Sequence, residues 1–198
     1  MSKFLYRITC GSMAIYLKIF RGFKIFGSEN IPKQGKLIIV ANHISNIDPI
    51  VLGCGVPRFV QFMAKKELFK VSLFGWLLKR VGAFPVSRGK ADLEAIKTSL
   101  KILRQGKVLG LFPEGTRHKV GKLGRALPGL VTIALKTKAP IVPCALTNTY
   151  KGKPVIVRVG KPIELKEYYN RKINKEEVEE AGKKIMKKIS DLLKIDAK

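Results

Sequence analysis

From Lys36 onward the chain alternates short apolar runs with segments of helical period, and this alternation limits its possible folds more than any other feature. The apolar runs are of strand length: Leu37–Val40, Phe59–Met63, Ala83–Val86, Val108–Phe112, Ile141–Leu146 and Val155–Val159. Two segments, Ala91–Gln105 and a stretch that starts near Lys175 after the capping residue Asn174, repeat apolar residues at helical steps. The pattern predicts a single α/β domain with a mixed, partly parallel sheet flanked by helices. A chain of 198 residues supports one such core and is short for two.

A segment rich in aromatic and aliphatic residues precedes this domain. It runs from Phe4 to Phe20, contains Arg7 and Lys18, and is followed by further basic residues. Basic and aromatic residues around an apolar helix are typical of helices that lie in a membrane interface. The alternative is a helix that packs its apolar side on the domain. We expect a membrane-associating segment over residues 1–26 and the folded domain over residues 27–198.

The formal charge of +25, from 39 Lys and Arg against 14 Asp and Glu, predicts an anionic partner. Nucleic acid, a membrane rich in anionic lipid, and an acidic carrier protein with a phosphorylated substrate all have the required sign. The three cysteines are far apart and lack metal-ligand spacing, which favours a reducing compartment over a disulfide framework or a zinc site. No apolar run is long enough for a spanning helix, and the first residues lack a signal-peptide cleavage pattern.

The turn after Leu37–Val40 contains a histidine and an aspartate, His43 and Asp48. Ends of strands in α/β folds are where reacting groups collect. A neutral imidazole held by a carboxylate can remove a proton from a hydroxyl nucleophile. The alternative is structural: Asp48 before Pro49 has the pattern of a helix cap, and His43 would then only bond the turn. Other motifs must decide between the two interpretations.

A second group of polar residues, Phe112-Pro113-Glu114-Gly115-Thr116-Arg117, follows the strand-like run Val108–Phe112. Glycine allows a ligand to approach the backbone, and an arginine offers a two-pronged donor to phosphate. The segment predicts a phosphate cradle, although a Pro-Gly turn with a surface ion pair would have the same letters. A third strand end, Gly82–Arg88, also ends on an arginine that could face the same cleft.

Together, Asn42-His43 with Asp48, then Gly82–Arg88, Phe112–Arg117 and Ile141–Pro143 resemble the four ordered blocks of the glycerolipid acyltransferases. The resemblance is closest to the bacterial 1-acyl-glycerol-3-phosphate acyltransferases and covers the chain from about Gly27 to Lys161. Two positions depart from the usual pattern. His118 stands where the family usually has serine, and Ser87 precedes Arg88 where a charged residue is frequent. These departures bear on acceptor selectivity more than on the His43 and Asp48 pair.

The resemblance implies acyl transfer from a thioester of coenzyme A or acyl carrier protein to the sn-2 hydroxyl of lysophosphatidic acid, giving phosphatidic acid. His43 would be the general base, Asp48 its orienting carboxylate, and backbone amides near the turn the donors to the oxyanion. The residues expected to bind the substrate phosphate are Lys65 or its neighbour Lys66, Arg88, Glu114, Gly115, Thr116 and Arg117. No metal ion and no cofactor are expected.

The expected partners are lysophosphatidic acid, acyl-CoA or acyl carrier protein, and an anionic membrane surface. The expected location is the cytoplasmic face of the cell membrane, as a peripheral or monotopic protein. Glycerol 3-phosphate or another lysophospholipid remains an alternative acceptor. A non-catalytic module that binds anionic lipid or nucleic acid is the alternative from another class. Nucleic acid is not expected, because Trp76 and most phenylalanines lie in apolar runs and not among exposed basic residues.

Overall fold

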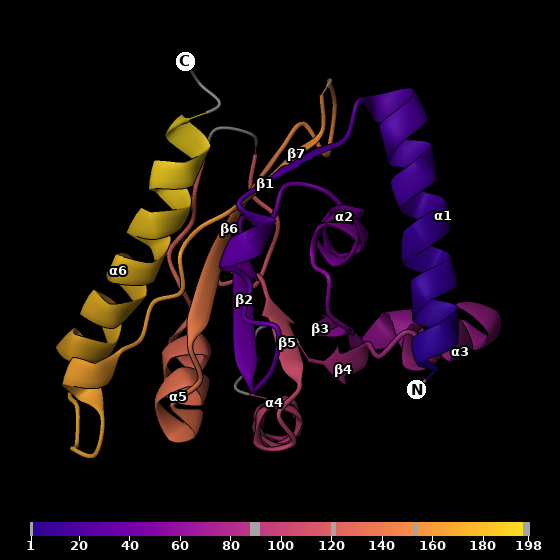
Figure 1. The fold of residues 1–198 in the computed structure, drawn as a ribbon. Helices are drawn as coiled ribbons and strands as arrows, with labels where there is room; N and C mark the ends of the chain where they lie inside the picture. Colours follow the sequence, from indigo (N-terminus) through magenta and orange to yellow (C-terminus); the bar gives the residue numbers. More distant parts are fainter. Residues whose placement is uncertain (1, 88–91, 120–121, 153, 196–198) are drawn as a thin grey trace.

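The computed structural model describes residues 2–87, 92–119, 122–152 and 154–195, which form one sheet with helices on both faces (Figure 1). The seven strands lie in the order β1-β7-β6-β2-β5-β3-β4. Their bounds are β1 Lys24–Phe26, β2 Leu37–Ala41, β3 Val60–Lys65, β4 Phe84–Val86, β5 Val108–Leu111, β6 Ile141–Thr147 and β7 Ile156–Val159. Strands β6, β2, β5, β3 and β4 are mutually parallel, whereas β7 is antiparallel to β6 and parallel to β1. The prediction of an α/β domain with a mixed sheet is confirmed.

The helices divide between the two faces of the sheet. Their bounds are α1 Lys3–Arg21, α2 Asp48–Gly55, α3 Ser72–Arg80, α4 Leu93–Arg104, α5 Pro128–Thr137 and α6 Lys175–Lys194, with short 3-10 helices at Ser28–Asn30, Lys66–Lys70 and Lys166–Tyr168. Because side chains alternate along a strand, Ile38 and Val40 of β2 pack with α4, α5 and α6. Leu37, Ile39 and Ala41 belong to the second core, under α1 and α2. This two-sided burial explains why the central strands are apolar throughout.

Helix α1 contacts the rest of the protein along one side only. Leu17 is fully buried, and the Ser2 N–H donates to the Arg80 carbonyl at 2.9 Å. Most of its large apolar residues are exposed: Phe4, Ile8, Ile15, Tyr16, Ile19 and Phe20. Directly after this helix, β1 pairs with β7, with Lys24 opposite Ile156. No helix in the described parts of the chain combines the length and apolar character that crossing a bilayer requires.

Candidate active site

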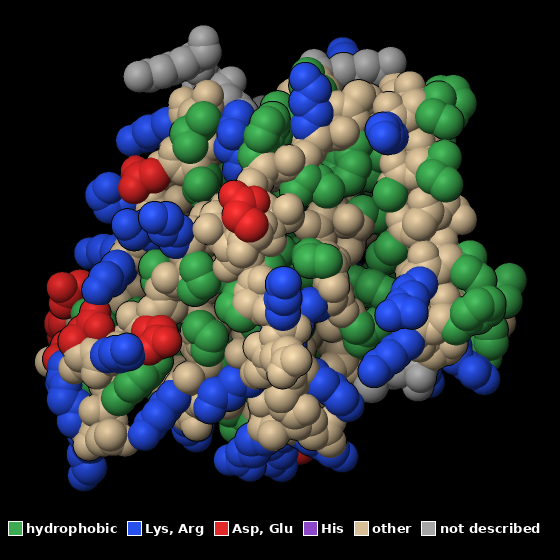
Figure 2. Space-filling view, in the orientation of Figure 1, with side chains coloured by type: hydrophobic (Ala, Val, Ile, Leu, Met, Phe, Trp, Pro, Cys, Tyr) green, Lys and Arg blue, Asp and Glu red, His purple; other side chains and the backbone are tan. Residues whose placement is uncertain are grey.

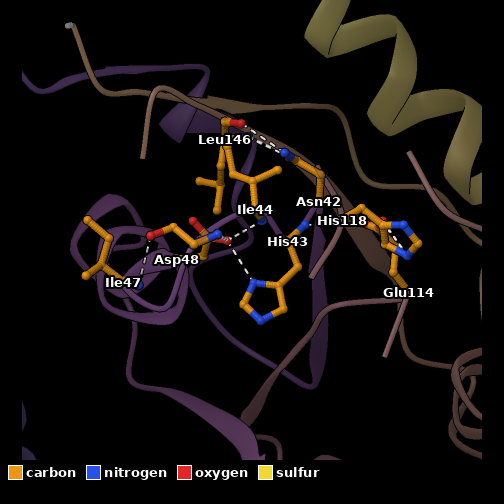
Figure 3. Close-up of polar contacts among 9 residues, drawn as sticks. Asn42, His43, Ile44, Ile47, Asp48, Glu114, His118 and Leu146 are labelled. Carbon is orange, nitrogen blue, oxygen red and sulfur yellow. Dashed lines mark hydrogen bonds and ion pairs between the residues drawn. The ribbon is translucent and has the colours of Figure 1, made fainter. Parts of the chain in front are cut away.

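The His43 and Asp48 side chains meet in the turn that follows β2. His43 Nδ1 and Asp48 Oδ2 lie 2.7 Å apart, and both residues are buried (Figure 3). Asn42 holds the start of this turn against β6, since its side-chain amide donates to the Leu146 carbonyl and accepts from the Leu146 N–H, at 2.9 and 2.8 Å. The Asn42 side chain thereby continues the β2–β6 pairing by one step. The histidine is held in a fixed position at the carboxyl end of the parallel strands.

The Asp48 carboxylate turns back toward the residues before it. Oδ2 accepts the backbone N–H groups of Ile44 and Ser45, each at 2.7 Å, in addition to facing the His43 ring. It makes no capping bond to the helix that begins at Asp48, so the expectation that this residue caps α2 is wrong. The capping alternative for the motif therefore fails, and the contact between carboxylate and imidazole remains. Three contacts on one oxygen orient both the turn and the ring.

The backbone of His43 is held from its other side by the segment after β5. The His43 N–H donates to Glu114 Oε1 at 3.0 Å, and the His43 carbonyl accepts from the His118 N–H at 2.9 Å. Glu114 Oε2 accepts the Gly124 N–H at 2.8 Å and lies 3.4 Å from His118 Nε2. Figure 3 shows Asp48 and Glu114 on opposite sides of His43. The Glu114 carboxylate therefore holds the backbone of the histidine, and Asp48 holds its ring.

These contacts correct two expectations about phosphate binding. The side chain of Glu114 is only 1% exposed and both its oxygens face protein groups, so it does not present a free surface to a phosphate. Gly115 has φ of 68°, a conformation that favours glycine, and a Cβ there would overlap the Leu127 side chain. This glycine makes room for the Leu127 side chain. The backbone N–H groups of His43, Ile44 and Ser45 already donate to carboxylates. These three amides are therefore not free to donate to an oxyanion, contrary to the expectation for the turn.

Arg117 lies apart from Glu114, at a hollow of about 410 Å³ beside the turn. The hollow is lined by residues 44–47 of the turn and by Arg21, Arg117, Thr149 and Tyr150. Thr116 is exposed. Arg117 is thus the one phosphate candidate among the described residues that lines this hollow.

Lys65 and Lys66, two further phosphate candidates, lie toward the β3 and β4 edge of the sheet. Lys65 is the last residue of β3, is exposed, and has its ammonium 3.9 Å from Glu67. Lys66 begins the 3-10 helix that follows. Arg88 lies outside the described residues, while Ser87 just before it donates its N–H to Asp92 at 2.7 Å. The structure therefore does not bring Lys65 to the hollow that Arg117 lines.

An aromatic surface lies against the His43 ring. The Phe112 ring stacks on His43 with centroids 4.2 Å apart, and Phe62 stacks on Phe112 at 6.1 Å. Phe112 directly follows β5, a position that was a usable signal in the sequence, although no role was predicted for its side chain. Thr149 and Tyr150, which follow β6, carried the same signal. Arg21 carried none, because it arrives from the N-terminal helix and not from a parallel strand.

Comparisons with known proteins identify the family of the chain. A family model described as Acyltransferase matches residues 22–147. A 1-acyl-sn-glycerol-3-phosphate acyltransferase of Bacillus subtilis (strain 168) is 35% identical over 167 residues, which cover 80% of this chain and 82% of that protein. A protein of the same name from Streptococcus pneumoniae is 34% identical over 167 residues, which cover 80% of this chain and 61% of that protein.

A solved structure extends the agreement to the fold. The crystal structure of the 1-acyl-sn-glycerophosphate (LPA) acyltransferase PlsC from Thermotoga maritima superposes with a TM-score of 0.79 at 24% identity. The superposition covers 98% of this chain and 80% of that one. The resemblance found in the four blocks is thus confirmed by both sequence and fold, and the chain belongs to the Acyltransferase family.

Proposed function

We propose that this protein transfers an acyl chain from an acyl thioester to the sn-2 hydroxyl of 1-acyl-glycerol 3-phosphate, giving phosphatidic acid. The observation that carries the proposal is the buried contact between His43 Nδ1 and Asp48 Oδ2, at 2.7 Å, in a chain of the Acyltransferase family. The names of the Bacillus and Streptococcus relatives support this acceptor. The donor is acyl-CoA or acyl carrier protein, and no cofactor takes part.

In the proposed mechanism the side chains move one proton and form no covalent intermediate. In the tautomer that donates its Nδ1–H to Asp48, the His43 Nε2 atom has a free lone pair and accepts the proton of the sn-2 hydroxyl. The alkoxide oxygen bonds to the thioester carbonyl carbon, and the carbon–sulfur bond then breaks. The leaving thiolate takes the proton back from His43. Asp48 stabilises the imidazolium that exists between these two transfers.

Membrane attachment is part of the proposal, since the acceptor is a lipid. Exposed apolar residues of α1, together with Leu73, Phe74 and Trp76 of α3, form what we call the apolar surface. Figure 2 shows hydrophobic side chains along the edge of the molecule that carries these two helices, with Lys and Arg beside them. Apolar residues flanked by cations suit an interface with anionic lipid. The protein would bind the cytoplasmic face of the cell membrane without spanning it.

The test is mass spectrometry of the product formed from lysophosphatidic acid with palmitoyl and oleoyl thioesters of coenzyme A and of acyl carrier protein. Phosphatidic acid is expected as the product, and His43→Ala should abolish it while leaving vesicle binding intact. A panel with glycerol 3-phosphate and other lysophospholipids tests the acceptor. Full turnover by the His43→Ala protein would contradict the assignment of the base, and turnover only with another acceptor would contradict the substrate.

A further inference from the structure

Two arginines from distant parts of the chain line one hollow beside the catalytic turn. Arg21 ends α1, and Arg117 follows β5. Among the described residues, the lining of the hollow contains these two cationic side chains and no carboxylate. The nearest carboxylate in the turn, Asp48, is directed to the amides of Ile44 and Ser45 and to the His43 ring. The hollow therefore has the charge that an anion requires.

Arg21 is held in place by neutral groups. Its guanidinium donates to the carbonyls of Asn148 and Gly152, at 2.8 and 3.2 Å, and its own carbonyl accepts the Val155 N–H at 3.0 Å. A guanidinium has five N–H donors, and carbonyl partners do not neutralise its charge. The contacts thus fix the side chain in position and leave its positive charge available to a ligand. The αL conformation of Asn148, with φ of 58°, belongs to the same turn between β6 and β7.

Thr149 adds a polar group that no described residue satisfies. It is 1% exposed, it lines the hollow, and its Oγ1 atom is buried without a hydrogen-bond partner among the described residues. A buried hydroxyl without a partner is costly, and an oxygen of a ligand in the hollow would satisfy it. Thr149 follows β6, whose parallel neighbour β2 leads into His43. The hydroxyl is therefore at the same end of the sheet as the catalytic pair.

We propose that this hollow is a phosphate-binding subsite in which Arg21, Arg117 and Thr149 hold the phosphate of one substrate. The proposal rests on the proposed function and extends it to residues outside the four sequence blocks, namely Arg21 and Thr149. The arginines supply charge and paired N–H donors, and the threonine supplies one hydroxyl donor. Two sources of the phosphate share this chemistry: the phosphate of the acceptor, and the phosphates of the coenzyme A or phosphopantetheine arm of the donor.

The kinetic test uses Arg21→Gln and Thr149→Val, with Arg104→Gln and Thr132→Val as matched controls. Arg104 is likewise the last residue of its helix, α4, and is exposed, while Thr132 is a half-buried threonine of α5 that does not line the hollow. KM is measured for lysophosphatidic acid and for acyl-CoA, and then for phosphate-free counterparts, monoacylglycerol and acyl-N-acetylcysteamine. Each hollow variant should raise KM for one phosphate-bearing substrate about tenfold, with kcat nearly unchanged. The phosphate-free counterpart of that substrate should show no such change.

The substrate whose KM rises identifies the source of the phosphate. Unchanged KM for both substrates, or an equal rise with the phosphate-free counterparts, would overturn the subsite. A direct measurement separates this result from the fate of the proposed function: calorimetric titration of the His43→Ala protein with glycerol 3-phosphate and with coenzyme A. Weaker binding after adding Arg21→Gln, but not Arg104→Gln, supports the subsite even if acyl transfer is absent. Failure of both compounds to bind at millimolar concentration would overturn it.

Discussion

At the scale of single residues, the two carboxylates around His43 do different things. Asp48 contacts the imidazole ring and the turn, whereas Glu114 accepts the backbone N–H groups of His43 and Gly124 and does not touch the ring of His43 in the contacts described above. Removing the charge of Asp48 should therefore affect the chemistry of the ring, and altering Glu114 should affect where the ring lies. The two effects are separable by kinetics.

For Asp48→Asn we expect kcat to fall by about 10³–10⁴-fold with KM nearly unchanged, because an amide in this place favours the wrong imidazole tautomer. Steady-state kinetics with lysophosphatidic acid measure the effect. Asp191→Asn, an exposed aspartate on α6 that pairs with Lys187 at 3.0 Å, is the control and should keep full activity. Wild-type kcat in the Asp48→Asn protein would exclude an orienting role.

For Glu114→Gln we expect kcat to fall by about 100-fold, because a small displacement of a catalytic group is that costly. Glutamine keeps one oxygen acceptor for two backbone N–H donors, those of His43 and Gly124, so its NH2 group must face one of them and the contact that positions His43 is disturbed. KM for lysophosphatidic acid should change little. A rise in KM with unchanged kcat would instead support the original expectation that Glu114 binds the substrate phosphate directly.

The sequence predicted His43 and Asp48 because they lie in one short turn after an unmistakable strand. The sequence did not predict which groups the Asp48 carboxylate contacts. An Asp-Pro pair looks the same in a sequence whether the aspartate caps the helix or bonds the preceding turn. The sequence also failed for Glu114, because its partners at His43 and Gly124 become neighbours only when the loop after β5 folds over the turn.

At the scale of elements, α1 and α2 meet through a small group of titratable residues. The Cys54 thiol donates to the Cys10 carbonyl at 3.3 Å, and a hydrogen bond with the Cys54 thiol lowers the pKa of Cys10 to about 7. The same pairing, together with burial, raises the pKa of Cys54. Burial alone raises the pKa of Cys144, inside β6, to about 12.

We therefore expect iodoacetamide to modify Cys10 first and Cys144 last in the folded protein, because the thiolate is the reactive form. The Cys10 rate should increase as pH rises through about 7, where that thiol loses its proton. Peptide mass spectrometry after timed alkylation measures this order, with Cys10→Ser as the control. Modification of Cys144 ahead of Cys10 would contradict the packing of α1 on α2.

Packing against the neighbouring strand explains the glycine in the central strand β5, Gly110. A Cβ at Gly110 would overlap the Phe62 ring of the neighbouring strand, so Gly110→Ala should lower the free energy of unfolding by about 1–3 kcal/mol. Gly11, within α1, has no atom within 4 Å of its Cβ position, and Gly11→Ala should raise the same quantity by about 0.5–1 kcal/mol. Urea denaturation of both variants measures the contrast, and equal effects would contradict it.

Elements with strong local patterns were predictable, and those defined by distant partners were not. The six apolar runs each correspond to a strand. Strand β1 was missed because its three residues are all exposed and are fixed only by pairing with β7. Helix α5 was missed because it is apolar on most sides and starts with Pro128 and Gly129, which have the letters of a turn.

At the scale of the whole molecule, the proposed membrane binding rests on two features together, the charge of +25 and the apolar surface. We expect flotation with vesicles that contain anionic lipid and little flotation with neutral vesicles, and we expect binding to weaken as salt is raised, because salt screens the attraction. Leu73→Asp, on the apolar surface at 77% exposure, should weaken binding. Leu93→Asp, 66% exposed on α4, is the matched control and should not. Equal flotation of the two variants would show that α3 does not contribute to membrane binding.

The pairing of β1 with β7 also determines the order in which the sheet can be completed. Lys24 lies opposite Ile156, so β1, the first of the sheet's described strands along the chain, cannot join the sheet until β7, the last of them, has been made. Closing so long a loop is slow and costs chain entropy. During synthesis the apolar side of α1 is therefore exposed while the domain is still incomplete. A nearby bilayer or a chaperone would protect it from aggregation in this period.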